Sequence, residues 1–195
     1  MINSFLKRLF DIAVSFFLIF LLTPFLLIIC LTIFFEIKQN PIFIQKRNGK
    51  NLKKFKIFKL KTMYQSEDGV NNFTQVNKGD ARISRTGSFL RKNSLDELPQ
   101  IFNVLIGNMS LVGPRPHPIA LDEQFKDVIK NYNQRYDVLP GITGLAQIRG
   151  YRGETDTIDK MNNRVKSDIE YTQTSNFFID LKIIFQTFRV LFKGI

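Results

Sequence analysis

The segment IAVSFFLIFLLTPFLLIICLTIFF, residues 12–35, runs for 24 positions without a charged side chain. A stretch of this length is typical of a membrane helix, because about 20 apolar residues cross a hydrocarbon core of about 30 Å. It is too long for the apolar region of a signal peptide, and no small-residue cleavage site follows it. We therefore expect residues 1–36 to form a membrane anchor.

Thr23 and Pro24 stand near the centre of this segment. Proline lacks a backbone N–H and clashes with the preceding helical turn, so a kink is predicted there. Each half would be roughly 17–18 Å long, which is too short to cross the bilayer alone. The segment is either a kinked span or a re-entrant helix that enters and leaves on the same side.

Both flanks of the apolar segment are basic. Lys7 and Arg8 precede it, and residues 37–66 contain nine Lys or Arg and no acidic residue. Positive flanks favour the cytoplasmic side, so two such flanks suit a re-entrant helix. A lysine run is also an ordinary solvated surface, and beside a membrane it attracts anionic lipid headgroups by about 1 kcal/mol per charge. No nucleic-acid-binding motif accompanies the charge, so nucleic acid is not an expected partner.

Composition limits the remaining options. The 195 residues suit one domain, and the formal net charge is +11. Cys30 is the single cysteine, which excludes an internal disulfide and a multi-cysteine zinc site. His117 is the single histidine, which excludes two-histidine metal sites.

The rest of the chain predicts a mostly helical domain with one β-hairpin. Asn48-Gly49 separates two β-forming runs, 41–47 and 53–60, although the loop between them could extend to Leu52. The remaining expected elements are helices over 89–105, 119–133, 156–172 and 177–192, a loop over 107–118 and turns over 140–153. The last helix is amphipathic and either packs in a core or, as we favour, lies in the membrane interface.

The segment RKNSLDELP, residues 91–99, concentrates groups capable of chemistry. Ser94 and Glu97 match a capping box, which is the purely structural interpretation. The functional interpretation rests on Asp96 and Glu97, because one carboxylate can act as a nucleophile while its neighbour holds a divalent cation. Arg91 lies one turn upstream and could bind phosphate.

Two further segments are candidates. Pro114 and Pro116 flank Arg115 and would orient its planar guanidinium for bidentate phosphate contact, although such arginines also occur in ordinary turns. His117 follows and is more often structural than ligating in such a position. The glycine-rich stretch 140–153 permits close approach of a ligand to the backbone, or forms a tight connection.

These motifs together resemble one family. KRLFDI (7–12), Thr23-Pro24, FKIFKLKTM (55–63), LRKNSLDELPQIFNVLIGNMSLVGPRP (90–116) and PGITGLAQIRGYRGETD (140–156) occur in the order found in bacterial sugar transferases. These are monotopic phosphoglycosyl transferases, which begin glycan assembly on a polyprenyl carrier. The resemblance covers nearly the whole chain.

The resemblance implies an α+β fold: a re-entrant membrane helix over 1–36, broken at Thr23-Pro24, then a mostly helical catalytic domain over 37–195 with a small β-hairpin and amphipathic interfacial helices. It also implies a place in the bacterial cytoplasmic membrane, with the catalytic domain on the cytoplasmic face. Many relatives carry an additional N-terminal membrane region, so the chain is expected to be a short-form enzyme or the trimmed catalytic unit.

The reaction implied by the resemblance has two steps. Asp96 attacks the sugar-bearing phosphate of a UDP-sugar and UMP leaves; undecaprenyl phosphate then takes the sugar phosphate from the enzyme. Glu97 matches a glutamate that holds Mg²⁺, and Arg91 and Arg115 match phosphate-binding arginines. Lys59 and Asp168 match a lysine and an aspartate that the family requires. YRGETD (151–156) resembles members that use glucose- or galactose-type sugars.

A non-catalytic alternative is a basic, membrane-anchored module that recruits a polyanion or a partner protein. Composition alone supports it. It gives no purpose to the adjacent Asp96 and Glu97 beside two arginine motifs, and UMP release from a UDP-sugar distinguishes the two hypotheses.

Overall fold

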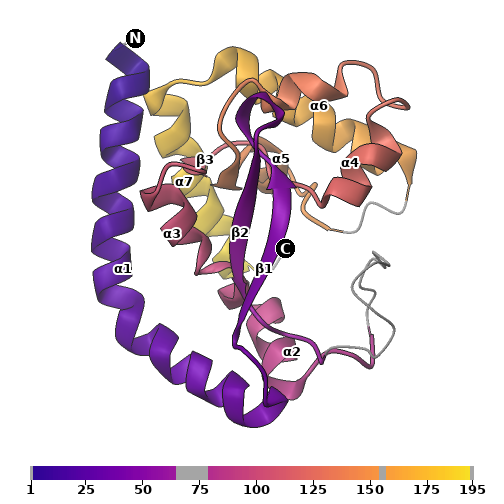
Figure 1. The fold of residues 1–195 in the computed structure, drawn as a ribbon. Helices are drawn as coiled ribbons and strands as arrows, with labels where there is room; N and C mark the ends of the chain where they lie inside the picture. Colours follow the sequence, from indigo (N-terminus) through magenta and orange to yellow (C-terminus); the bar gives the residue numbers. More distant parts are fainter. Residues whose placement is uncertain (1, 65–78, 154–156, 194–195) are drawn as a thin grey trace.

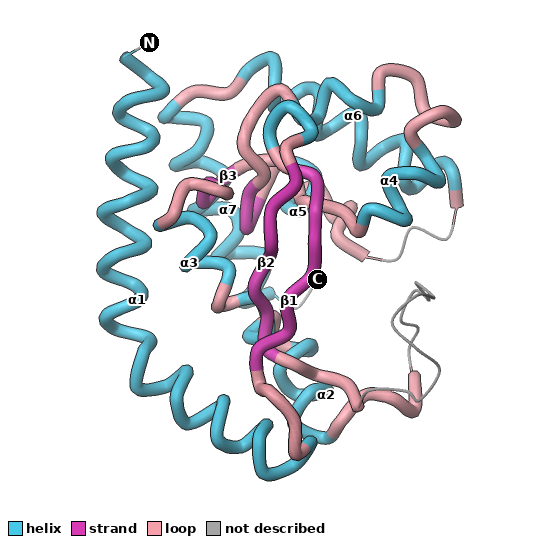
Figure 2. The backbone as a smooth tube through the Cα atoms, viewed as in Figure 1, coloured by secondary structure: helices cyan, strands magenta, loops and turns pink. Residues whose placement is uncertain are grey.

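The computed structural model describes residues 2–64, 79–153 and 157–193, apart from the side chains of residues 2–4 and 191–193. A long N-terminal helix lies along one side of a body of helices that also contains two small sheets, and the β-hairpin of residues 42–60 lies at the outer face of this body (Figure 1, Figure 2). The elements are α1 (Ile2–Ile37), β1 (Ile42–Asn48), η1 (Lys50–Leu52), β2 (Lys54–Leu60), α2 (Arg85–Lys92), η2 (Leu95–Glu97), α3 (Gln100–Leu105), β3 (Ser110–Val112), α4 (Ile119–Phe125), η3 (Tyr132–Tyr136), β4 (Gly141–Thr143), α5 (Leu145–Ile148), α6 (Ile158–Thr174) and α7 (Phe177–Lys193). The expected mixture of helices and a small hairpin is confirmed.

The predicted hairpin is present, with the longer of the two loops considered. Strands β1 and β2 pair antiparallel from Ile42↔Leu60 to Asn48↔Lys54. A short 3-10 turn, η1, joins them, and Asn51 within it has a left-handed φ of 54°. The β2 edge away from β1 is covered by α3, because Asn103 hydrogen bonds to the backbone of Phe58 and Lys56.

The second sheet was not predicted. Strands β3 and β4 pair in parallel. Strand β3 lies within the expected loop over 107–118, and β4 and α5 lie within the expected turns over 140–153. That expectation was wrong because each strand has only three residues, too few to show alternation. Val112 of β3 packs in the central core with Ile57, Val104 and Tyr171.

The helices of the C-terminal half were predicted with one error. Helices α6 and α7 match the expected ranges closely, but the helix expected over 119–133 ends at Phe125. Turns follow from Lys126 to Lys130, and Asn131, with a left-handed φ of 61°, directly precedes η3. Leu121 and Phe125 of α4 pack on Tyr132 of η3 and on Met161 and Val165 of α6 in a second core.

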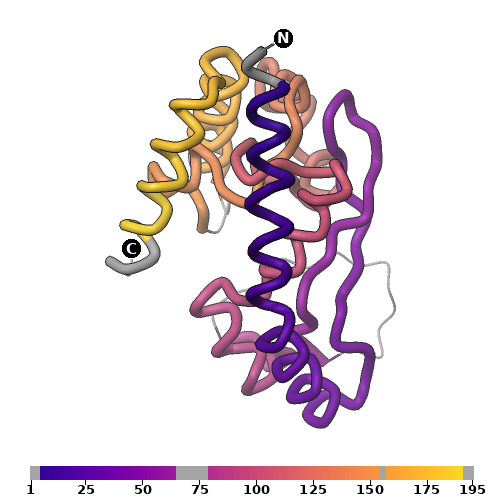
Figure 3. The backbone as a smooth tube through the Cα atoms, turned by 90° about the vertical axis from the view of Figure 1, so that its left-hand side faces the viewer, coloured from indigo at the N-terminus to yellow at the C-terminus, as the bar shows by residue number. Residues whose placement is uncertain are grey.

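Both ends of α1 contact the same body. Near its N-terminal end, Arg8 donates to the carbonyls of Val104 and Leu105 at 2.8 and 2.9 Å, and Asp11 accepts from Leu111 N–H at 3.1 Å. Near its C-terminal end, Ile33 and Ile37 pack against Leu60 and Leu90. Figure 3 shows α1 running the length of this side of the molecule, with α7 next to it.

Helix α1 bends part-way along its length, and it contains Pro24 (Figure 1). Pro24 has no N–H to donate within the helix, and Thr23 Oγ1 donates to Ile19 O at 2.6 Å. Both features bend helices. Phe5–Ile37 is long and apolar enough to cross a membrane by length and composition, and only 17% of its most apolar window is buried.

Candidate active site

Asp96 and Glu97 lie in a break between two helices. The helix expected over 89–105 is interrupted, because Ser94 adopts a left-handed φ of 58° between α2 and η2. Ser94 makes no capping hydrogen bond, so the capping-box interpretation is wrong. The break turns the carboxylate of Glu97 away from the helix end and towards Lys59 and Arg115.

Glu97 is buried and surrounded by cations. Its Oε2 accepts from Arg115 Nη1 at 2.8 Å, and its Oε1 accepts from Arg115 Nη2 and from Lys59 Nζ, the latter at 3.2 Å. Arg152 Nη2 lies 3.6 Å from Oε2. Burial opposes ionisation, but Arg115 and Lys59 outweigh it and hold the pKa of Glu97 well below its ordinary value of 4.5. Glu97 is therefore a fixed negative charge at neutral pH.

Asp96 has different surroundings from its neighbour. It is half-buried, and within the described ranges nothing donates a hydrogen bond to its carboxylate. Burial and the negative charge of Glu97 raise the pKa of Asp96 above its ordinary value of 3.8. The two adjacent carboxylates thus differ in their contacts: Glu97 accepts hydrogen bonds from Arg115 and Lys59, whereas Asp96 accepts none within the described ranges.

The loop that carries Arg115 is fixed through three consecutive carbonyls. Pro114 O accepts from Gly141 N–H at 2.9 Å, Arg115 O from Arg135 Nη2 at 2.7 Å, and Pro116 O from Arg47 Nη1 at 3.4 Å. A Cβ on Gly141 would lie 2.0 Å from the backbone nitrogen of Gly113, so this approach of β4 to the loop requires glycine. Arg115 is consequently positioned by its backbone before any ligand binds.

Asp168 lies behind the site. It does not contact Glu97; it accepts from Arg135 Nη2 at 2.8 Å and from Arg135 Nε at 3.1 Å. Both side chains are almost completely buried. Although burial disfavours the guanidinium, Asp168 raises the pKa of Arg135 above its ordinary value. Asp168 therefore acts on the site indirectly: it contacts Arg135, and Arg135 donates a hydrogen bond to the backbone carbonyl of Arg115.

His117 belongs to the same buried network. Its Nδ1 lies 2.6 Å from Arg135 Nη1 and 2.8 Å from the hydroxyl of Tyr132, which donates to Asp122. Burial, together with the charge of Arg135, lowers the pKa of His117 well below 6.5. The expectation that this histidine is structural agrees with these contacts.

Arg91 is close to the carboxylates without touching them. Its Nη1 donates to Thr62 Oγ1 at 3.5 Å, and its charge lowers the pKa of Asp96 only as a minor influence. The structure thus gathers Lys59, Glu97 and Arg115 around Asp96 and leaves Arg91 at the rim.

Three arginines of the site were missed by sequence reasoning. Arg152 approaches Glu97; Arg47 holds the Pro116 carbonyl; and Arg164 donates to Tyr151 O at 2.7 Å and Gly153 O at 2.6 Å, which fixes Arg152 between them. Burial, reinforced by the charge of Arg115, lowers the pKa of Arg47 and of Arg164 to about 10. So many cations around one ionised glutamate favour binding of a further polyanion.

A magnesium ion suits the donor set at this site. No cluster of three or more His, Cys, Asp or Glu side chains occurs in the described part of the chain. Mg²⁺ nevertheless commonly binds through one or two carboxylates together with substrate phosphates. Asp96 supplies one such carboxylate, which accepts no hydrogen bond within the described ranges. The adjacent Glu97 could supply a second only by exchanging a contact with Arg115 or Lys59 for the ion.

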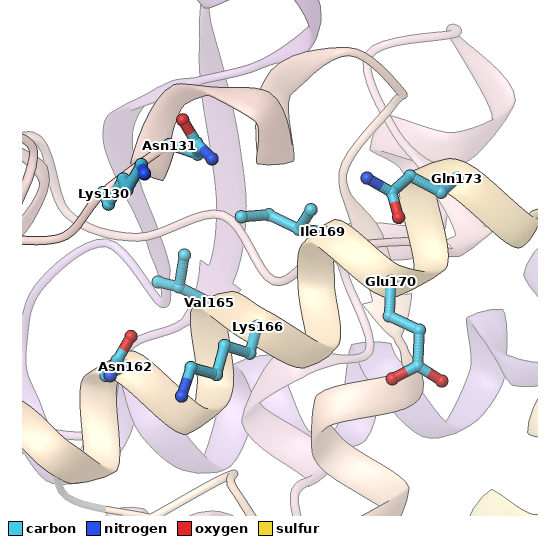
Figure 4. A pocket seen from close by; sticks show the side chains of 8 residues that line it. All are labelled: Lys130, Asn131, Asn162, Val165, Lys166, Ile169, Glu170 and Gln173. Carbon is cyan, nitrogen blue, oxygen red and sulfur yellow. The ribbon is translucent and has the colours of Figure 1, made fainter.

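A separate hollow lies between α6 and the segment that leads into η3. Figure 4 shows Val165 and Ile169 of α6 in its wall, with Lys130 and Asn131 from the segment that leads into η3. None of Lys59, Asp96, Glu97 and Arg115 lines it. The candidate active site is the cation-rich cluster and not this hollow.

Comparisons with known proteins agree with the motifs. The family model described as bacterial sugar transferase matches residues 2–194. A UDP-glucose:undecaprenyl-phosphate glucose-1-phosphate transferase of Klebsiella pneumoniae is 47% identical over 99% of this chain, and one of Caulobacter vibrioides is 45% identical over 93%. The exopolysaccharide production protein PSS of Rhizobium leguminosarum is 42% identical over 93%. The aligned regions cover 41%, 67% and 92% of these three relatives.

Proposed function

The chain belongs to the bacterial sugar transferase family, and from that premise we propose that it transfers a hexose-1-phosphate from a UDP-sugar to undecaprenyl phosphate. The observation that carries the proposal is the carboxylate of Asp96, which accepts no hydrogen bond within the described ranges. It stands beside Glu97, whose carboxylate Arg115 and Lys59 hold ionised. A nucleophile and a preformed cationic site for a diphosphate thus stand next to each other.

The proposed reaction has two displacements at one phosphorus atom. A carboxylate oxygen of Asp96 attacks the sugar-bearing phosphorus of the UDP-sugar; the bond from that phosphorus to the bridging oxygen breaks, and UMP leaves. An oxygen of undecaprenyl phosphate then attacks the same phosphorus. The bond to Asp96 breaks, the carboxylate is restored and undecaprenyl diphosphate-sugar is released. Covalent catalysis divides one difficult transfer into two easier ones.

The protein's contribution is position and charge. Phosphoryl transfer depends chiefly on aligning the groups and neutralising the charge on the phosphate oxygens. In our proposal Arg115 and Lys59 do this for the diphosphate, with Arg152 and Arg91 at the rim. Mg²⁺, when bound by Asp96 or Glu97, neutralises further charge on the phosphates.

Asp168 has a positioning role in this proposal. It holds Arg135, whose Nη2 also donates to Arg115 O at 2.7 Å. The carboxylate lies almost completely buried against Arg135. We therefore assign Asp168 to the support of the Arg115 loop and not to contact with substrate.

We further propose that α1 is a re-entrant membrane helix with both ends on the cytoplasmic face of the bacterial inner membrane. A straight helix of 36 residues would be about 54 Å long. In the bent helix, Arg8 and Ile37 contact one body from opposite ends. Large apolar side chains are exposed elsewhere along α1, among them Phe16, Phe20 and Phe35 at 68%, 79% and 74%. Contiguous apolar surface of this kind favours lipid.

Helix α7 is proposed to lie in the membrane interface beside α1. Phe178, Phe185 and Phe188 are exposed on it, while Ile183 is buried in the central core. Such a helix is anchored by one face and offers aromatic side chains on the other. The two helices would keep Asp96 near the headgroup level, where a polyprenyl phosphate presents its charge.

For the sugar we propose glucose, because relatives at 45–47% identity are named for glucose-1-phosphate. The YRGETD motif supports the same choice; its last three residues, 154–156, lie outside the described part of the chain. The chain spans less than half of the Klebsiella relative, so this assignment rests on the shared region.

UMP release tests the proposed function. The purified membrane protein is incubated with Mg²⁺, undecaprenyl phosphate and UDP-glucose, and in parallel with UDP-galactose and UDP-N-acetylgalactosamine. We expect UMP and a lipid-linked product, most rapidly with UDP-glucose. Asp96→Asn should abolish both, while Asp137→Asn, at an exposed carboxylate, should not. No UMP from any UDP-sugar would favour the non-catalytic module, and substantial activity of Asp96→Asn would place the nucleophile elsewhere.

A further inference from the structure

Gln100 carries a buried amide close in sequence to the candidate active site, and this amide has no partner within the described ranges. It is the first residue of α3 and is 1% exposed. Neither its Nε2 nor its Oε1 forms a hydrogen bond with any group in the described ranges. Buried polar side chains normally have partners, so this amide requires an explanation.

Its neighbours on the helix show which way Gln100 faces. Leu98 and Pro99, which join η2 to α3, have helical backbone angles, so the chain from Glu97 to Asn103 keeps helical spacing and residues three apart lie on one face. Three positions before it, Glu97 contacts Lys59 of β2. Three positions after it, Asn103 accepts from Phe58 N–H at 3.0 Å and donates to Lys56 O at 2.7 Å, both in β2. Gln100 therefore lies between these two contacts, on the side of α3 that faces β2 and three residues after Glu97.

Asn103 and Gln100 differ in how their side-chain amides contribute to the stability of the folded state. Both polar ends of Asn103 satisfy backbone groups at the edge of β2, which stabilises the folded state. An unpartnered buried amide instead destabilises the folded state relative to an apolar side chain of similar size. The amide of Gln100 therefore contributes nothing to this form of the protein through hydrogen bonding.

Two groups of the site complement the amide. The carboxylate of Asp96, four residues earlier, accepts no hydrogen bond within the described ranges and could accept one from Nε2. Lys59 has three N–H donors, and within the same ranges it uses one, on Glu97. Its remaining donors could reach Oε1.

We propose that Gln100 is a positioning residue of the transfer reaction. When the substrate diphosphate engages Arg115 and Lys59, the Gln100 amide donates to Asp96 through Nε2 and accepts from Lys59 through Oε1. The bridge orients the nucleophilic carboxylate and keeps the ammonium in place. The inference rests on the proposed role of Asp96 as the nucleophile.

Two variants on one helix face test it. Gln100→Met keeps the length of the side chain and removes the amide, and Asn103→Leu is the matched control that removes a partnered amide. For Gln100→Met we expect an unchanged or higher melting temperature and a fall of about tenfold or more in the single-turnover rate of UMP release. KM for the UDP-sugar should change by less than about threefold, because the interaction strengthens in the reacting complex. Asn103→Leu should lower the melting temperature.

Each alternative result overturns the inference. A Gln100→Met protein that melts as low as Asn103→Leu would make Gln100 a structural cap of β2. Unchanged melting with a rate within about twofold of the original would leave the amide without a role in the transfer. Asp96→Asn keeps the two proposals distinct: if that variant is inactive and Gln100→Met is fully active, only the role of Gln100 fails. If Asp96→Asn remains active, both fail.

Discussion

Replacing Asp168 by asparagine removes the counter-charge of a deeply buried arginine while keeping the volume of the side chain. Asp168 accepts two hydrogen bonds from Arg135, at 2.8 and 3.1 Å, and both side chains are at most 2% exposed. The asparagine retains one acceptor oxygen, and Asp122 remains 3.6 Å from Arg135. Breaking a buried ion pair costs about 3–5 kcal/mol. Because Asp122 compensates part of the charge, we expect the lower end, about 3 kcal/mol.

That loss of stability has a measurable size. For a chain of this length, 1 kcal/mol changes the melting temperature by about 2–4 °C, so Asp168→Asn should lower it by about 6–12 °C. The transfer rate, measured well below the melting temperature, should fall while KM for the UDP-sugar rises. The reason is that Arg135 also holds Arg115 O, and a looser loop binds the diphosphate less well.

The assay is thermal unfolding of the detergent-solubilised protein, paired with initial rates of UMP release. Asp159→Asn, at an exposed aspartate on the same helix, is the matched control and should shift neither quantity appreciably. Suppose instead that Asp168→Asn melts within about 2 °C of the original protein and yet transfers nothing. Asp168 would then act on the substrate directly, and the positioning role would be wrong.

Three further predictions concern the buried His117, the buried Glu97 and the bend of α1 at Thr23-Pro24. Burial and the charge of Arg135 lower the pKa of His117 in the folded chain, so below pH 6.5 the unfolded chain binds a proton at His117 and the folded chain does not. The free energy of unfolding should therefore fall by about 1.4 kcal/mol between pH 7.5 and pH 5.5. Urea unfolding at both pH values measures this, and an equal fall in His117→Gln would contradict it. Glu97→Gln should reduce transfer by about 100-fold or more, and EDTA should have the same effect, because an amide is a poorer ligand for Mg²⁺ and leaves Arg115 uncompensated; activity in excess EDTA would remove the metal from the reaction. The topology is read from a cysteine placed at Asn3 in a protein that also carries Cys30→Ser. With Thr23 and Pro24 unchanged, this cysteine should be labelled only from the cytoplasmic side. Adding Thr23→Leu and Pro24→Ala should straighten α1 and make the cysteine accessible to labelling from outside the cell. Labelling from outside the cell in the protein that keeps Thr23 and Pro24 would refute the re-entrant topology.

Local chemistry made part of the site predictable. Asp96, Glu97, Arg115 and Lys59 were chosen from residue types and from a family resemblance, and the structure brings all four together. The hairpin around Asn48-Gly49 and the helices α6 and α7 were predicted because turn residues and apolar periodicity are local signals. The break at Ser94 was not, since its left-handed φ of 58° occurs at a residue that matches a capping box.

The supporting residues could not be predicted because their partners are distant in sequence. Arg135 contacts Asp168 across 33 positions and Arg115 across 20, and Arg47 reaches Pro116 across 69. Nothing in the surrounding sequence marks these arginines apart from those on the surface. One signal could have indicated them: the chain has 28 Lys and Arg against 17 Asp and Glu, while the reactive segment 91–99 has only two acidic residues, Asp96 and Glu97.

Lys7 and Arg8 show how one sequence feature carries two physical meanings. As charges before an apolar segment, they indicate a cytoplasmic N-terminal end through the positive-inside rule. In the structure, Lys7 Nζ donates to Asp180 at 2.5 Å and to Val112 O at 3.1 Å. Arg8 donates through Nη1 and Nη2 to the carbonyls of Val104 and Leu105 in α3. These contacts fix the N-terminal end of α1 to β3, α3 and α7. In the proposed re-entrant arrangement, docking would therefore act together with charge to keep this end on the side of the catalytic domain, because a spanning helix would have to break these hydrogen bonds.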